Sequence, residues 1–119
     1  MAKRERIING DFDDLLETID SLLVCDNVVA IAKSNADYTG NGTRCAIRTY
    51  EQRSAWRSDF AILTVTLVQD ENQIYVSGIT SDGNSEKLFD LNSNGEYIFL
   101  DSFTNALNEY EAKLSDSKV

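Results

Sequence analysis

The pattern of apolar and polar positions predicts two helices that bracket a series of strands. The first helix follows Asp11, a typical N-cap, and has Asp13 and Asp14 in its first turn, where acidic residues complement the helix dipole. Apolar residues then recur at intervals of three and four, which indicates a single helical stripe. The stripe consists of Phe12, Leu15, Leu16, Ile19, Leu22 and Leu23. We expect this helix to end at Asp26-Asn27.

A second helix is predicted near the C-terminus. Ser93 and Glu96 have the spacing of a capping box, so we expect the helix to begin there and to run to about residue 114. Its apolar stripe consists of Leu100, Phe103, Leu107, Tyr110 and Leu114, widened by Phe99 and Ala106. Residues 1–3 and 115–119 are expected to be frayed, as chain ends commonly are.

Runs rich in β-branched residues predict strands joined by short turns. The strands are expected at 4–9, 28–32, 44–50, 60–68 and 74–79, with a short last one at 87–91. Asn41-Gly42 predicts a two-residue hairpin turn, because both central positions of a type I′ turn need positive φ. The order β-α-β-β-β-β-(β)-α predicts an α+β fold, a two-layer sandwich in which an antiparallel meander of about four to six strands carries both helices on one face. No linker or repeat divides the chain, so residues 1–119 are expected to form a single domain.

The second face of the sheet is the open question. In segment 60–68, Ala61, Leu63, Val65 and Leu67 share one face, but the other face also carries apolar residues. Those are Phe60, Ile62 and Val68, with Thr64 and Thr66 between them. A strand wetted on one side would alternate more cleanly. Either the long side chains of neighbouring strands shield this second face, or a partner or ligand covers it.

Composition excludes several classes of function. The chain has 119 residues, 20 of them acidic and 11 basic, and its net charge of −9 disfavours nucleic acid and anionic lipid as partners. It has no histidine, which excludes histidine triads and imidazole metal ligands. The glycines form no phosphate-binding loop, and no calcium loop is present, so we expect no catalytic residues, metal or cofactor. Cys25 and Cys45 are interpreted as small core residues. Without a signal peptide or a long apolar run, the expected location is the cytoplasm.

Residues 44–57 form an arginine-rich stretch in this acidic chain. Four arginines and one glutamate give the stretch a formal charge of +3, and two aromatic residues lie among them. An anion- or phosphate-binding patch is one interpretation, because guanidinium groups suit such ligands. Its candidate lining is Arg44, Arg48, Tyr50, Arg53, Trp56 and Arg57. The alternative is internal ion pairing, since the chain offers many carboxylates.

From Cys45 onwards the chain resembles a small, uncharacterised bacterial family, a domain of unknown function. The resemblance rests on Ala46-Ile47-Arg48-Thr49-Tyr50-Glu51, on 63–67, on 74–81, and on Gly95-Glu96 and Phe99-Leu100. It covers roughly two-thirds of the chain, mostly as strand patterns. The family has a Gly-Gly-Ser turn after the Ile-Thr-Ser strand, whereas this chain has Asp82-Gly83-Asn84-Ser85. The resemblance implies the fold and implies no activity.

Three functions therefore compete. The sequence favours a non-enzymatic binding or interaction module, one that self-associates as a homodimer through the uncovered sheet face or through an edge strand. The alternative is a domain that binds a small ligand or anion through the arginine and aromatic residues of 44–57. A carboxylate-based hydrolase is the third hypothesis, resting only on the abundance of acids.

Overall fold

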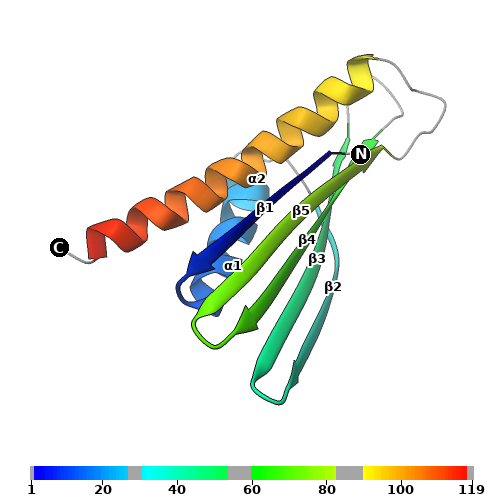
Figure 1. The fold of residues 1–119 in the computed structure, drawn as a ribbon. Helices are drawn as coiled ribbons and strands as arrows, with labels where there is room; N and C mark the ends of the chain where they lie inside the picture. The colour runs from blue at the N-terminus through cyan, green and yellow to red at the C-terminus, as the bar shows by residue number, and fades with distance from the viewer. Residues whose placement is uncertain (1, 27–30, 54–59, 83–89, 118–119) are drawn as a thin grey trace.

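The computed structural model describes residues 2–26, 31–53, 60–82 and 90–117 (Figure 1). The strands are β1 (Ala2–Asn9), β2 (Ile31–Gly40), β3 (Thr43–Arg53), β4 (Phe60–Asp70) and β5 (Gln73–Asp82). The helices are α1 (Phe12–Asp20), continued by the π-helical turn η1 (Ser21–Asp26), and α2 (Asp90–Ser117). Their order matches the predicted order of helices and strands.

The strands form one antiparallel sheet of five, in the order β1-β5-β4-β3-β2. β2 to β5 are a meander, and β1 joins it by pairing with β5. The turn between β2 and β3 has positive φ at both Asn41 (53°) and Gly42 (79°), which confirms the predicted hairpin turn. Glu71 also has a positive φ (59°) in the turn between β4 and β5.

Both helices lie on the same side of the sheet (Figure 1), so the predicted two-layer α+β fold is confirmed. Alternate residues of each strand point toward the helices, as the pleat of a strand requires. On β4 these are Ala61, Leu63, Val65 and Leu67, the set that the sequence predicts for one face, and all four are buried. They join the apolar stripes of the helices in one hydrophobic core.

The first helix begins as predicted. The side chain of Asp11 accepts a hydrogen bond from the backbone N–H of Asp14 at 2.9 Å, which satisfies a donor that the helix itself leaves unpaired. Phe12, Leu15 and Ile19 are buried against the core. The π-helical turn that follows carries the buried Leu23 and ends at Asp26, at the predicted end of the helix.

The second helix packs on β5, β1 and β4, and a glycine sets its distance from the sheet. Gly78 is buried in β5 below the ring of Phe103, and a Cβ at position 78 would lie 2.5 Å from Cε2 of that ring. The ring therefore rests on the backbone of the strand. At the sheet edge, Nη1 of Arg6 in β1 reaches Oε1 of Glu111 in α2 at 2.8 Å.

The two helices are also tied to each other. The hydroxyl of Tyr110 in α2 accepts a hydrogen bond from the backbone N–H of Asp11 at 2.8 Å and donates one to the carbonyl oxygen of the same residue at 3.2 Å. Gly10 makes room for this contact, because a Cβ there would lie 2.7 Å from the tyrosine hydroxyl. The N-cap of α1 is thus held by a side chain about 100 residues later in the chain.

The ends of the elements differ from the prediction in several places. The helix α2 begins at Asp90, so Ser93 lies inside it and the predicted capping box is wrong. Asp90 and Leu91 are helical, which overturns the expected last strand at those positions, while 87–89 lie outside the described residues. Of the segments expected to be frayed, residues 2–3 belong to β1 and 115–117 to α2, while 1, 118 and 119 lie outside the described residues.

The strand β2 is longer and more polar than predicted. It continues through the polar stretch to Gly40, whereas residues 28–30 of the predicted strand lie outside the described residues. Its pairing with β3 is interrupted by a bulge between Ala32 and Ser34. Polar residues and bulges are common on edge strands, because they discourage pairing with a further strand.

Cys45 is half-buried on the face away from the helices, so it is not the core residue expected.

Replacing Gly78 by alanine tests the helix-sheet contact. We expect Gly78→Ala to lower the free energy of unfolding by about 1–3 kcal/mol, because the added methyl group overlaps the Phe103 ring. Chemical denaturation measures the effect. The double variant Gly78→Ala/Phe103→Leu should lose less than the sum of the two single variants, and strict additivity would contradict the contact.

Candidate functional site

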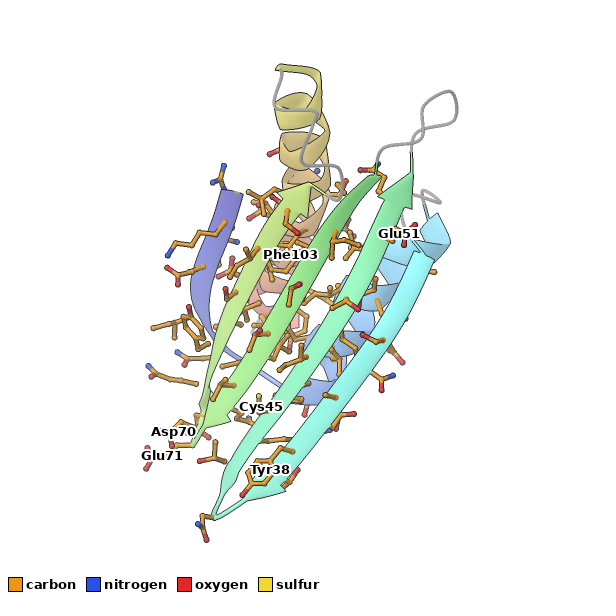
Figure 2. The ribbon with its side chains drawn as sticks, turned by 90° about the vertical axis from the view of Figure 1, so that its right-hand side faces the viewer. Tyr38, Cys45, Glu51, Asp70, Glu71 and Phe103 are labelled. Atoms are coloured by element: carbon orange, nitrogen blue, oxygen red, sulfur yellow. The ribbon has the colours of Figure 1, made fainter. Side chains whose placement is uncertain are left out.

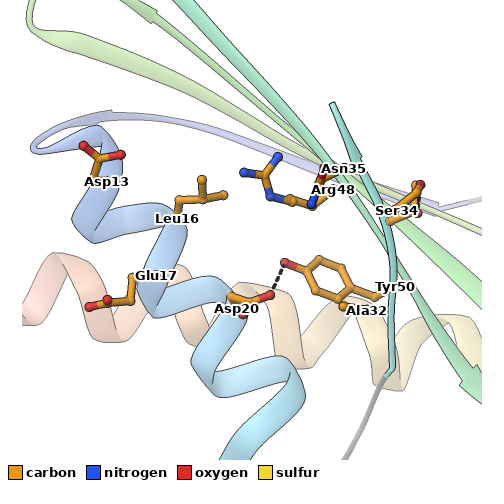
Figure 3. Close-up of a pocket in the computed structure, with 10 residues that line it drawn as sticks. Asp13, Leu16, Glu17, Asp20, Ala32, Ser34, Asn35, Arg48 and Tyr50 are labelled. Carbon is orange, nitrogen blue, oxygen red and sulfur yellow. Dashed lines mark hydrogen bonds between the residues drawn. The ribbon is translucent and has the colours of Figure 1, made fainter. Parts of the chain in front are cut away.

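A cavity of about 550 Å³ lies between α1 and the β2–β3 side of the sheet (Figure 3). Three carboxylates, Asp13, Glu17 and Asp20, line it from α1. From the sheet it is lined by polar and aromatic side chains that include Asn35, Arg48 and Tyr50. Two residues of the predicted ligand-binding set, Arg48 and Tyr50, therefore border a cavity, and a row of acids faces them.

The guanidinium group of Arg44 is held by the first turn of α1. Nη2 of Arg44 lies 2.7 Å from Oδ1 of Asp13, and Cζ lies 4.2 Å from the centre of the Phe12 ring. A hydrogen-bonded ion pair and a cation–π contact thus act on the same group. The hydrogen bond from Arg44 holds the pKa of Asp13 below its ordinary value. Arg44 fastens β3 to the start of the helix.

Arg48 is the second arginine on this face of β3. Its Nη1 donates to Oδ1 of Asp37 and to the backbone carbonyl oxygen of Ile47, both at 3.0 Å. Its side chain is only 19% exposed, whereas that of Asp37 is 60% exposed. Arg48 is therefore a largely sheltered cation at the cavity, paired across the sheet with a carboxylate on the edge strand.

Tyr50 connects the sheet to the end of α1. Its side chain is fully buried, and its hydroxyl donates a hydrogen bond to Oδ1 of Asp20 at 3.1 Å (Figure 3). Burial, then the charge of Asp20 and the hydrogen bond to it, raises the pKa of the Tyr50 phenol well above its ordinary value of 10.0. The phenol therefore stays protonated and keeps the hydrogen bond throughout the neutral range.

The structure brings together only part of the predicted patch. Arg44, Arg48 and Tyr50 share the helix-facing side of β3, as the alternation predicts, and both arginines are paired with carboxylates. The side chain of Arg53, and Trp56 and Arg57 altogether, lie outside the described residues. The acidic wall was not predicted, although Asp13, Glu17 and Asp20 recur at helical spacing, a signal that the sequence offers.

A second candidate site is the sheet face turned away from the helices, which we call the open face. Figure 2 looks onto it, with the helices behind the sheet. Strand register places one residue from every strand in a line across this face, which we call the apolar row. The apolar row consists of Ile7, Tyr75, Val68, Cys45 and Tyr38. Its two ends are strongly exposed, Ile7 at 60% and Tyr38 at 65%.

The described residues in the middle of the open face carry no charge. The three central strands contribute three residues each, which we call the central block. The central block consists of Cys45, Ile47 and Thr49 from β3, Thr64, Thr66 and Val68 from β4, and Tyr75, Ser77 and Ile79 from β5. Charged residues described on this face, such as Lys3, Glu5 and Asp70, lie around the block on the edge strand β1 and at the strand ends.

Neighbouring side chains shield this face only in part. Thr64, Thr66 and Val68 on the central strand are half-buried, as the first of the two explanations from the sequence requires. Their neighbours remain accessible, with Ile47 at 37%, Tyr75 at 38% and Ile79 at 39% exposure. Tyr75 donates a hydrogen bond to Glu5, and the hydroxyls of Ser34 and Thr49 share one of 2.6 Å. The helices and strands that the structure describes thus leave this face uncovered.

Two further features of the described residues bear on function. No group of three or more cysteine, aspartate or glutamate side chains in the described part of the chain is arranged to hold a metal ion. None of the helices there is both long enough and apolar enough to cross a membrane.

A family model matches residues 1–111, and its description is a family of unknown function, DUF6054. The chain belongs to this family. The match extends over the first helix and strand, which the resemblance noted from the sequence did not include. No curated protein matches the chain.

Solved structures resemble this DUF6054 protein only distantly. An 18 kDa protein of Caulobacter crescentus is 8% identical, with 95% of each chain covered and a TM-score of 0.40. A hypothetical protein of Helicobacter pylori is 9% identical, with 85% of this chain and 83% of that one covered and a TM-score of 0.40. The Zhui aromatase/cyclase of Streptomyces sp. R1128 is 9% identical, with 98% and 92% covered and a TM-score of 0.33.

Tyr50→Phe tests the hydrogen bond that joins β3 to the end of α1. We expect a loss of about 1 kcal/mol in the free energy of unfolding at neutral pH. Because the folded state raises the pKa of Tyr50, its contribution is complete below the unfolded-state pKa of about 10 and is lost as the pH rises above that value. Urea denaturation between neutral and strongly alkaline pH should therefore show a shallower alkaline loss for Tyr50→Phe than for the wild type. Parallel profiles would contradict this assignment.

Arg48→Gln tests the anion site. If Arg48 serves only its pair with Asp37, the variant should lose less than about 1 kcal/mol of stability, because Asp37 is largely exposed. If the cavity binds anions, inorganic phosphate should raise the melting temperature of the wild type and not that of the variant. Asp37→Asn breaks the same ion pair but keeps the arginine, so it should retain any phosphate effect. An equal phosphate effect on all three proteins would rule out the anion site.

Proposed function

We propose that this protein is a non-enzymatic interaction module that binds a protein partner through its open face. One observation carries the proposal: a five-stranded sheet has helices on one side and, across the middle of the other, a central block without charge. Exposed apolar side chains that gather on one surface commonly mark an interaction site, and Ile47, Tyr75 and Ile79 of this block are each more than one-third exposed. The sequence of β4 departs from a clean alternation of apolar and polar residues, and the apolar residues responsible for that departure lie on this face.

The composition of the open face favours protein as the partner. The central block has no charged residue and contains Tyr75, and the centres of protein interfaces are likewise depleted of charge and enriched in tyrosine. The described side chains of this face include one basic residue, Lys3, which forms a 4.0 Å ion pair with Glu5. Such a surface offers little to the phosphates of nucleic acids or to anionic lipids.

A cytoplasmic location is part of the same proposal. The thiol of Cys45 is free and half-buried within the apolar row, where oxidation would alter the binding surface. Free thiols of this kind persist in reducing compartments.

The cavity under α1 favours a second candidate, a small-ligand site. Its supporting observation is the sheltered guanidinium of Arg48 beside a cavity of about 550 Å³, a volume in the range of ligand sites. Against an anion stand the carboxylates on the α1 wall and the existing pair of Arg48 with Asp37. The phosphate experiment above separates this candidate from a structural role of Arg48.

A pair of matched lysine variants tests the interaction module. Ile47→Lys places a charge within the central block, whereas Ala112→Lys places the same charge at an exposed position of α2. Each tagged protein is produced in the cells that make it naturally and recovered with whatever it retains, other copies of itself included. We expect wild type and Ala112→Lys to retain the same proteins and Ile47→Lys to lose at least one of them, because a buried charge disrupts an interface.

Identical retention by all three proteins would contradict the proposal. Circular dichroism and thermal melting of the purified variants provide the control for folding. Ile47 is more than one-third exposed in the isolated chain, so its replacement should leave the helix and strand content unchanged.

A further inference from the structure

We propose that the partner on the open face is a second copy of this chain, related by a two-fold axis that runs along β4 between the two sheets. The inference rests on the proposed function and adds the identity of the partner and its orientation. The two copies would form a four-layer assembly in which the sheets face each other and the helices lie outside, as in other packed pairs of sheets.

The size of the open face suits a dimer. Five strands about 4.8 Å apart, with about 3.3 Å per residue over eight to eleven residues, give an area on the order of 700 Å² per copy before side-chain relief is counted. A stable protein interface buries about 800 Å² per partner. The face is therefore large enough for a specific dimer.

The distribution of charge favours self-association through this face over any other. The chain carries −9, so two copies repel each other unless their acidic surfaces stay apart. The first helix and its N-cap alone carry Asp11, Asp13, Asp14, Glu17 and Asp20. Facing sheets bring the uncharged central blocks together and leave both helix layers outermost. Two sheets then separate the acidic helices by more than the Debye length of about 8 Å.

The register of the apolar row sets the direction of the axis. A two-fold axis along β4 brings the row onto itself in reverse order, because β4 is the central strand. Val68 then meets its own copy, Tyr75 meets Cys45, and Ile7 meets Tyr38. The same axis places Glu5 opposite Ala36, so the charges of β1 meet no like charge, while Asp70 at the end of β4 is set beside its own copy at the rim of the interface. An axis across the strands would instead set this row against the row that contains the buried Glu51.

Sedimentation equilibrium of the purified protein tests the identity of the partner. Between about 1 and 200 µM we expect the mass to rise from the 13.3 kDa of one chain to twice that value. Ile47→Lys should weaken association at least ~10-fold, whereas Ala112→Lys should leave it unchanged.

The outcomes separate this inference from the proposed function. The proposal that the partner is a second copy is overturned if the wild type stays monomeric throughout, or if Ile47→Lys does not weaken the dimer. A monomer that nevertheless retains another protein through Ile47 leaves the interaction module standing with a different partner. If the protein is monomeric and Ile47→Lys also retains the same proteins as the wild type, both proposals are overturned.

An exchange of charge tests the orientation and uses two strongly exposed positions, where substitution should not affect folding. Ile7 and Tyr38 lie at opposite edges of one sheet, about 19 Å apart by strand spacing, so they cannot contact each other within a copy. Ile7→Lys and Tyr38→Glu should each weaken the dimer several-fold. The double variant should recover most of the loss, because the proposed axis pairs the new lysine with the new glutamate of the other copy. Additive losses would contradict an axis along β4.

Discussion

The contact between Phe103 and the bare backbone of Gly78 is the constraint on which the rest of the architecture depends. It seats α2 directly on β5, and from there α2 reaches β1 through Arg6 and α1 through the hydroxyl of Tyr110. The tyrosine hydroxyl holds the N-cap of α1 against α2, and the two helices pack against each other. The space left over β2 and β3 is the cavity, where Arg44 and Tyr50 span the gap with polar contacts.

Both helices are needed to build this core, and none of the described chain is left for the other face. One side of the sheet therefore packs into the core that stabilises the fold. Side chains on the other side contribute less to that core. Ala61, Leu63, Val65 and Leu67 stabilise the isolated chain by leaving water. Thr64, Thr66 and Val68, on the same strand, remain half-buried and contribute less. The two candidate sites follow from this asymmetry. The cavity lies where the helices cover β2 and β3 only in part, and the open face is the side on which no described helix packs.

Sequence patterns were sufficient for the fold because its signals are local. The stripe of α1, its Asp11 cap and the Asn41-Gly42 turn each depend on a few adjacent residues, and each is confirmed. The start of α2 was misplaced because Ser93 and Glu96 fit a capping box that the helix does not use. The candidate site was only partly predictable for a different reason. The pairing of Arg44 with Asp13, and of Arg48 with Asp37, depends on how distant segments come together, and spacing along the chain carries no record of it.

The alternation of β3, β4 and β5 has a consequence for how such a family can diversify. Alternate positions of the same strands face the core and the open face, so most substitutions on the open face leave the core side chains in place. A gene duplicate could change Ile47, Thr66 or Ile79 and acquire a new binding preference while keeping Leu63, Val65 and the seat of Phe103 intact. The positions that form the core and the positions proposed to contact a partner are thus encoded by different codons of the same strands.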